Sequence, residues 1–258
     1  MCGVAHLGDY FYVLTQDEAP KVSVYGLDDF HLNATIELPI MISPSDIAAC
    51  QKKQRLYVAD SRYILCAYPG GDYEIWLEAE FAAPDFGVSS VSVTSGRLLV
   101  TSYTGQQLIL YSEELERIAL IGLPYYMRPL YATESAADTI VLSHVGAFTT
   151  CGDVEGEFYQ ICEIGRRGEI LRTFGDPNYK SHLGLHLPRY IAMDSAGGRM
   201  FVADSAKRRI LLLNSDFELE CVIVEGLDSD PCRLCYDEES GRLLVSDFYG
   251  CVCVYSIS

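Results

Sequence analysis

The sequence predicts an all-β protein, a six-bladed β-propeller of four-stranded antiparallel blades whose last blade has three strands. Three observations lead to this prediction. A strand-like motif recurs six times, a second strand-like segment precedes each copy at the same spacing, and no segment keeps an apolar period of 3.6 residues. The repeat length of about 43 residues matches the ~40–45 residues of a propeller blade. A large β-sandwich is the alternative, but sandwiches do not repeat a motif at fixed spacing.

The repeat is clearest where an arginine is followed by aliphatic or aromatic residues, as at 55–60, 97–102, 199–204 and 242–247. Two weaker copies lie at 10–15 and 139–144. The central aliphatic residues of the six copies are Val13, Val58, Val100, Leu142, Val202 and Val245. The preceding strands are marked by Val4, Ile47, Val91, Leu130, Ile191 and Leu234. Both markers recur at nearly constant spacing except after the fourth copy, which is longer.

The predicted blades cover 1–41, 42–82, 83–125, 126–176, 186–227 and 228–258, in one domain. Inner strands are expected to begin near Gly3, Ser45, Ser89, Arg128, Arg189 and Cys232. The extra length of the fourth copy, residues 146–157, is rich in glycine and acidic residues, and we interpret it as an exposed loop.

Composition narrows the classes of partner. The formal net charge is −17, which disfavours nucleic acid and anionic membranes, because both are bound through clustered Lys and Arg. No apolar run reaches the ~18 residues of a membrane-spanning helix, and the first residues lack the pattern of a signal peptide. Most of the ten cysteines lie in apolar strand-like runs, so we expect reduced thiols and a cytoplasmic location.

The fifth copy carries a family resemblance in three segments, at 174–176, 187–194 and 199–210. They read Phe-Gly-Asp, Leu-Pro-Arg-Tyr-Ile-Ala-Met-Asp and Arg-Met-Phe-Val-Ala-Asp-Ser-Ala-Lys-Arg-Arg-Ile. This pattern resembles the NHL repeat, although the glycine that usually follows its proline is missing here. The resemblance implies a propeller like that of tripartite-motif proteins, which binds RNA or protein. More distantly, it implies kinship with lactonase-like and strictosidine synthase-like propellers, some of which are hydrolases or lyases. No RING, B-box or coiled-coil pattern occurs in these residues, so ligase activity is not implied.

Candidate catalytic and metal-binding groups each have a structural alternative. Asp60, Asp204 and Asp247 end equivalent strands, where a carboxylate accepts hydrogen bonds from turn N–H groups, and Arg209 is expected to pair with Asp204 or a nearby carbonyl. The cysteine pairs at 232/235 and 251/253 lie two strands apart, too far for one zinc ion. His144, His182 and His186 are the histidines considered as ligands of one metal ion, and solvated loop histidines are the structural alternative.

The inner strands define two rings at the mouth of the central channel. The outer ring is predicted as Cys2, Ser45, Ser89, Arg128, Arg189 and Cys232. The next ring is predicted as Gly3, Asp46, Ser90, Pro129, Tyr190 and Arg233. A divalent cation needs several oxygen ligands, and these rings offer one carboxylate. We therefore expect no metal, no cofactor and no catalytic residue here.

Three arginines at this mouth would repel one another unless Asp46 or an anionic ligand neutralised them. We expect a non-catalytic scaffold that binds a protein or peptide on this face, with an acidic peptide as one form of that partner. A small-molecule ligand is a further alternative. The expected contact residues are Arg128, Arg189, Arg233, Tyr103, Tyr125, Tyr126, Tyr190, Phe248 and Tyr249. Internal pairing of the arginines with Asp46, Asp228 or Asp230 is the structural alternative. A propeller-type hydrolase or lyase and an RNA-binding NHL domain are the functional alternatives.

Overall fold

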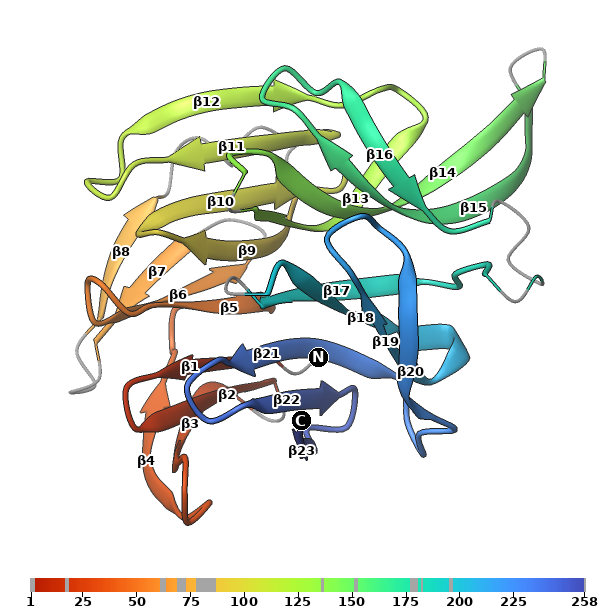
Figure 1. The fold of residues 1–258 in the computed structure, drawn as a ribbon. Coiled ribbons are helices and arrows are strands. Elements are labelled where there is room, and N and C mark those ends of the chain that lie inside the picture. The colour runs from red at the N-terminus through yellow and green to blue at the C-terminus, as the bar shows by residue number, and fades with distance from the viewer. Residues whose placement is uncertain are drawn as a thin grey trace.

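The computed structural model describes residues 3–16, 19–60, 64–68, 73–77, 87–135, 137–150, 153–176, 181, 183–194 and 197–257. The strands form six separate antiparallel sheets, each from one continuous stretch of sequence (Figure 1). His182 and Cys2 lie outside the described residues.

Within each sheet the strands follow one another from the channel outwards. Blade 1 has β1 (Gly3–Leu7), β2 (Tyr10–Gln16), β3 (Pro20–Gly26) and β4 (Leu32–Glu37). Blade 2 has β5 (Pro44–Cys50), β6 (Arg55–Asp60), β7 (Ile64–Ala67) and β8 (Tyr73–Leu77). Blade 3 has β9 (Val88–Thr94), β10 (Arg97–Ser102), β11 (Gln107–Tyr111) and β12 (Arg117–Gly122).

The second half of the chain repeats this plan with two departures. Blade 4 has β13 (Met127–Glu134), β14 (Ile140–Thr150), β15 (Asp153–Ile164) and β16 (Ile170–Phe174). Blade 5 has β17 (Pro188–Asp194), β18 (Arg199–Asp204), the 3-10 turn η1 (Ser205–Lys207), β19 (Arg209–Leu213) and β20 (Leu219–Glu225). Blade 6 has three strands, β21 (Pro231–Asp237), β22 (Arg242–Asp247) and β23 (Val252–Ser256).

The first strands of the six sheets lie side by side in a ring, and β21 contacts β1 to close it. The fold is therefore a six-bladed β-propeller with a three-stranded last blade, as predicted. The inner strands begin at Gly3, Pro44, Val88, Met127, Pro188 and Pro231, each within one residue of the predicted position. No helix in the described part of the chain has the length and apolar character needed to cross a membrane.

The aliphatic markers pair across the first two strands of the blades, for example Ile47 with Val58 and Ile191 with Val202. Blade 4 corrects one prediction. Leu142 pairs with Ala132, whereas Leu130 lies unpaired at a β-bulge between Pro129 and Tyr131. Leu130 is the larger aliphatic residue and therefore suggests a register two residues too early, because the position that pairs with Leu142 holds the small Ala132.

The interpretation of residues 146–157 as a loop is also wrong. Strands β14 and β15 stay paired from Ile140 opposite Ile164 up to Thr150 opposite Asp153. The extra residues thus form a long β-hairpin that projects beyond the neighbouring strands (Figure 1). A two-stranded extension satisfies its own backbone groups, which a loop of this length would leave to solvent.

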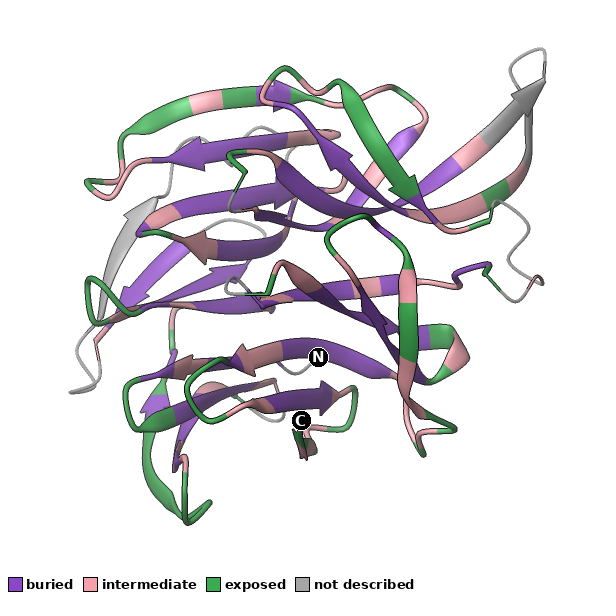
Figure 2. Cartoon of the chain, viewed as in Figure 1, coloured by how far each residue is buried: buried purple, intermediate pink, exposed green. Residues whose placement is uncertain are grey.

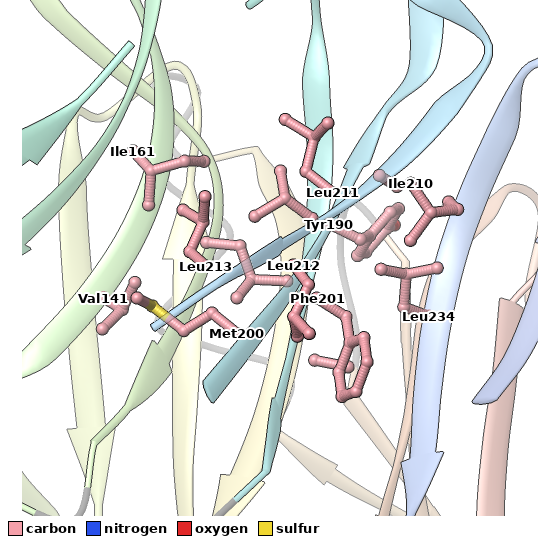
Figure 3. Packing of buried hydrophobic residues seen from close by; sticks show 14 of the residues in the cluster. Val141, Ile161, Tyr190, Met200, Phe201, Ile210, Leu211, Leu212, Leu213 and Leu234 are labelled. Atoms are coloured by element: carbon pink, nitrogen blue, oxygen red, sulfur yellow. The ribbon is translucent and has the colours of Figure 1, made fainter. Parts of the chain in front are cut away.

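Apolar side chains fill the gaps between adjacent blades. The outermost strands β4, β12, β16 and β20 are mostly exposed or half-buried (Figure 2). Around blade 5, Phe201 packs with Tyr236 of blade 6 at a centroid distance of 4.7 Å, and Val141 and Ile161 close the cluster from blade 4 (Figure 3). The arginine at the start of the second strand links neighbouring blades at Arg55, Arg97 and Arg242, whereas Arg199 binds Asp194 within its own blade. Arg97 of blade 3 binds Glu134 of blade 4 at 3.0 Å, and Arg242 of blade 6 binds the Leu27 carbonyl of blade 1 at 2.9 Å.

Candidate functional site

All inner strands begin at one face of the propeller, which we call the entrance face. Because adjacent strands are antiparallel, the second strand of each blade ends there as well. The entrance face therefore collects the turns before the inner strands, the turns between second and third strands, and the β14–β15 hairpin. The predicted contact residues lie at or just inside this face.

A plug closes the channel below the entrance face. Arg233 is buried, and its Nη1 donates to both carboxylate oxygens of Asp46 at 2.8 and 2.6 Å. The guanidinium lies 5.0 Å from the ring centroid of Tyr131 and 5.1 Å from that of Tyr190, and the two rings lie beside each other at 5.0 Å. Side chains from blades 2, 4, 5 and 6 thus meet on the axis.

The charges of this plug are satisfied inside the protein. Asp46 also accepts from the backbone N–H groups of Ile47 at 2.8 Å and Val91 at 2.9 Å. Burial raises the pKa of the Asp46 carboxyl to about 6, although Arg233 opposes the shift. Burial by itself would lower the pKa of Arg233, but the adjacent Asp46 keeps that pKa above its usual value. With its oxygens already accepting four hydrogen bonds from three donor nitrogens, Asp46 has little capacity left for a cation.

The corrected register of blade 4 changes the composition of both rings. Tyr131, rather than Pro129, is equivalent to Tyr190, since both follow the bulged residue of their inner strand. Leu130 then replaces Arg128 in the outer ring. The mouth does not hold three arginines side by side, because Arg233 lies in the plug and Arg128 lies outside the rings. Arg233 and Tyr190 are buried, so we leave both out of the proposed contact surface.

Arg128 lies between the hairpin and blade 3. Its guanidinium is 3.4 Å from the Glu157 carboxylate, 3.3 Å from the Tyr103 hydroxyl and 5.7 Å from the Tyr103 ring. Glu157 and Tyr159 are joined by a hydrogen bond of 3.4 Å, and the ring of Tyr159 lies 5.5 Å from that of His186. Neither Glu157 nor Tyr159 was predicted as a site residue. Glu157 fell in the segment interpreted as a loop, and the alternation of a paired strand, which places Glu157 and Tyr159 on one face of β15, was therefore not used.

Arg189 has a different environment. It is the bulged residue of β17, and its guanidinium lies over the ring of Phe248 at 4.7 Å. Its Nε is buried without a hydrogen-bond partner, and no carboxylate of the described residues lies within ion-pair distance. Arg189 is therefore a cation that the described part of the chain does not neutralise.

Exposed aromatic side chains surround these cations. Tyr249 is 85 % exposed beside Phe248, in a turn held by Asp247, which accepts from the N–H groups of Tyr249 at 2.8 Å and Cys251 at 2.9 Å. Tyr125 is 77 % exposed and packs edge-on against Tyr126 at 5.7 Å. The predicted turn role of Asp247 is thereby confirmed. So is that of Asp204, which accepts from His186 N–H at 2.7 Å and Arg209 at 2.7 Å.

The histidine and cysteine candidates do not converge in the described residues. His144 is buried, with its Nε2 3.1 Å from Sγ of Cys162. Burial lowers the pKa of His144 to about 4 and raises that of the Cys162 thiol to about 12, so both are neutral near pH 7. A neutral thiol is a poor nucleophile, which argues against a Cys–His catalytic pair. Cys232 and Cys235 lie on β21 and Cys253 on β23, with β22 between them.

A hollow lies at the end of the channel opposite the entrance face. Its volume is about 320 Å³, and Arg233 and Tyr131 of the plug form part of its lining together with Ser92, Thr133 and Glu134. Sequence reasoning had not predicted it. The plug separates this hollow from the entrance face.

Comparisons with known proteins identify the class of fold. No family model and no curated protein matches the chain. Among solved structures, Kuenenia stuttgartiensis hydrazine synthase matches with a TM-score of 0.71 and 16 % identity, over 99 % of this chain and 83 % of that chain. The WD40 β-propeller domain of Doa1 matches with a TM-score of 0.62 and 11 % identity, over 99 % and 81 %. Streptogramin B lyase matches with a TM-score of 0.55 and 16 % identity, over 83 % and 68 %.

These similarities place the chain among β-propellers. The similar structures include enzymes as well as WD40 domains, and at such low identity they show the fold alone.

Proposed function

We propose that this propeller is a non-catalytic binding module whose entrance face takes up an acidic segment of a protein partner. The observation that carries the proposal is Arg189, a cation stacked on Phe248 and left without a carboxylate partner in the described part of a chain of net charge −17. An arginine in this position favours a planar, bidentate anion such as a carboxylate.

The surroundings of Arg189 support the proposal. Phe248 and Tyr249 form an exposed aromatic edge on one side. Across the mouth, the weak pair of Arg128 with Glu157, at 3.4 Å and partly exposed, contributes little in water and can be exchanged for a partner's carboxylate. Tyrosine and arginine also dominate binding energy at protein interfaces, because they combine apolar area with directed donors.

The proposal extends to family and location. We infer an NHL-type propeller from the fifth repeat, and a protein rather than an RNA partner from the acidic net charge. Six cysteines that the structure describes carry free thiols, which supports a reducing, cytoplasmic compartment; they are Cys50, Cys162, Cys221, Cys235, Cys251 and Cys253.

The test uses fluorescent peptides and fluorescence anisotropy. A glutamate-rich peptide with two tyrosines should bind, whereas its glutamine counterpart should not. Arg189→Gln should weaken binding by roughly 10- to 100-fold, the value of one charged hydrogen-bonded contact. Arg128→Glu combined with Arg189→Glu should abolish it.

The matched control is Arg167→Gln, which removes the same charge from an exposed turn on the opposite face. It should leave binding unchanged. Equal loss with both variants would mean that net charge alone governs the interaction and would overturn the site. Turnover of an ester or lactone that Arg189→Glu removes would instead favour an enzyme.

A further inference from the structure

Blade 6 differs from the others at its outer edge. In the part of the chain that the structure describes, it has three strands, and β23 is the outermost. The third strands of blades 3 and 5 are almost entirely buried, whereas no residue of β23 is buried (Figure 2). An edge strand presents a row of backbone N–H and C=O groups that can pair with another chain.

Hollows flank β23 on both faces. Towards blade 1, Phe11, Tyr25 and Phe30 line a hollow of about 410 Å³ with Val252 and Val254 of β23. Towards blade 5, a hollow of about 420 Å³ is lined by Val224 and Leu227 together with Cys253 and Tyr255. Side chains of a strand alternate between two faces, so an added strand beside β23 would direct its side chains into both hollows.

The other five blades show what such a strand must carry. In each of them, the aliphatic marker of the second strand pairs with a residue of the third strand; in blade 1, Val13 pairs with Ser23. The third-strand residue just before it in the sequence pairs with an apolar residue of the fourth strand. The pairs are Val22–Ile36, Ile64–Leu77, Leu108–Ile121, Ile161–Phe174 and Ile210–Val224. The equivalent residue of blade 6 is Val252, because Val245 pairs with Cys253.

In blades 1, 3 and 4 the fourth-strand residue at this position is buried in the gap between blades, and in blade 5 the equivalent Val224 is half-buried. Ile36, Ile121 and Phe174 are 5 %, 2 % and 8 % exposed, although the strands around them face solvent. Directly opposite residues of an antiparallel pair share one face of the sheet. A residue opposite Val252 would therefore enter the aromatic hollow beside Phe11 and Tyr25.

We propose that the outer edge of β23 binds an extended segment of a partner protein, which pairs antiparallel as the fourth strand of blade 6. The segment places a large apolar residue opposite Val252. Its net charge is zero or positive, since Asp228 and Asp247 border the hollow on the blade 5 side. The same acidic character disfavours a second copy of this chain, whose net charge is −17. This edge lies apart from the entrance-face arginines, so the proposal stands independently of the proposed function.

The chain offers a probe and a reporter for the test. The probe is a synthetic peptide of residues 116–123, which contains the fourth strand of blade 3 and its buried Ile121. The reporter is the exposed Cys253 on β23, and exposed Cys221 on β20 serves as the internal control. Maleimide modification of each thiol is followed by mass spectrometry with and without peptide. At millimolar peptide, modification of Cys253 should slow at least about tenfold while that of Cys221 does not change.

Matched variants separate strand pairing from unspecific adhesion. The peptide with Ile121→Asp should give no protection of Cys253. In the protein, Val252→Asp should abolish protection, whereas Ser256→Asp, on the exposed end of the same strand, should not. Circular dichroism should show both protein variants folded; if Val252→Asp unfolds, Val252→Thr takes its place.

Three outcomes would overturn the proposal. The first is an unchanged rate for Cys253 at saturating peptide. The second is equal protection by the Ile121→Asp peptide. The third is a peptide-free dimer, seen by light scattering, in which Cys253 is protected and regains reactivity on dilution, because that would assign the edge to a second copy.

Discussion

Blades 4 and 6 follow the same register but differ in what covers their third strands. Cys162 of blade 4 pairs with Leu142, and Cys253 of blade 6 pairs with the equivalent Val245. Under the fourth strand β16, Cys162 is fully buried against His144, whereas Cys253 is exposed. The same residue type at the same place in the repeat is thus a core residue in one blade and a surface residue in the other. The comparison teaches that the outermost strand, rather than the repeat motif, decides whether the third strand belongs to the core.

The largest expected effect is on thiol reactivity. We predict that Cys253 reacts with iodoacetamide at least on the order of 1000-fold faster than Cys162 in the native protein at pH 8. The reagent reaches Cys162 only when blade 4 unfolds locally. Burial also raises the pKa of the Cys162 thiol to about 12, which removes the reactive thiolate. Mass spectrometry of timed samples measures both rates. Comparable rates would show that blade 4 is not sealed, while both thiols should react alike in 6 M guanidinium chloride.

The second test concerns how a blade with one strand fewer is held in the ring. Arg233 ties blade 6 to Asp46 of blade 2 across the axis. Arg233→Met should therefore lower the free energy of unfolding by about 3–5 kcal/mol, since it leaves Asp46 buried without its counter-ion. Urea denaturation followed by circular dichroism measures the loss. Adding Asp46→Asn to Arg233→Met removes the uncompensated charge and keeps an amide oxygen as an acceptor for the N–H groups of Ile47 and Val91, so it should restore part of the loss. A single variant within about 1 kcal/mol of the wild type would contradict the role of the plug.

The third test uses the histidine that seals Cys162. Burial lowers the pKa of His144 from 6.5 to about 4, so between these values the unfolded chain binds the proton and the folded chain does not. The contribution of His144 is therefore fully present above about pH 6.5 and is lost as the pH falls towards 4, by roughly 3 kcal/mol. His144→Phe, which retains a ring against Phe158, should remove this part of the pH dependence. Denaturation curves at several pH values measure the difference, and parallel profiles for both proteins would contradict it.

The same residues show which parts of the fold and of the candidate site could be predicted from the sequence. The spacing of the aliphatic markers was sufficient to predict six blades and the starts of the inner strands, because pairing partners repeat with the blade. The register of blade 4 was predicted wrongly, although its inner strand has the same bulge as those of blades 2, 3 and 5. The reason is that Ala132, which pairs with Leu142, is small, whereas the nearby Leu130 resembles the large aliphatic markers of the other blades. That error put Arg128 into the mouth and hid Tyr131, one of the two rings that hold Arg233. The pairing of Arg233 with Asp46, 187 positions apart, depends on ring closure and has no local signature.

The smallest expected effect compares equivalent aliphatic residues of the two third strands. Ile161 and Val252 occupy the same place in the repeat, but Ile161 is fully buried beneath Phe174 and Val252 is half-buried at an open hollow. Ile161→Ala should cost about 2–5 kcal/mol, because its removal leaves a cavity that the neighbouring blade cannot refill. Val252→Ala should cost about 1 kcal/mol or less, since the side chain loses few contacts. Urea denaturation of the two variants in parallel gives both values. A cost of 2 kcal/mol or more for Val252→Ala would mean that the gap beside β23 closes in solution, and the contrast between blades 4 and 6 would then no longer hold.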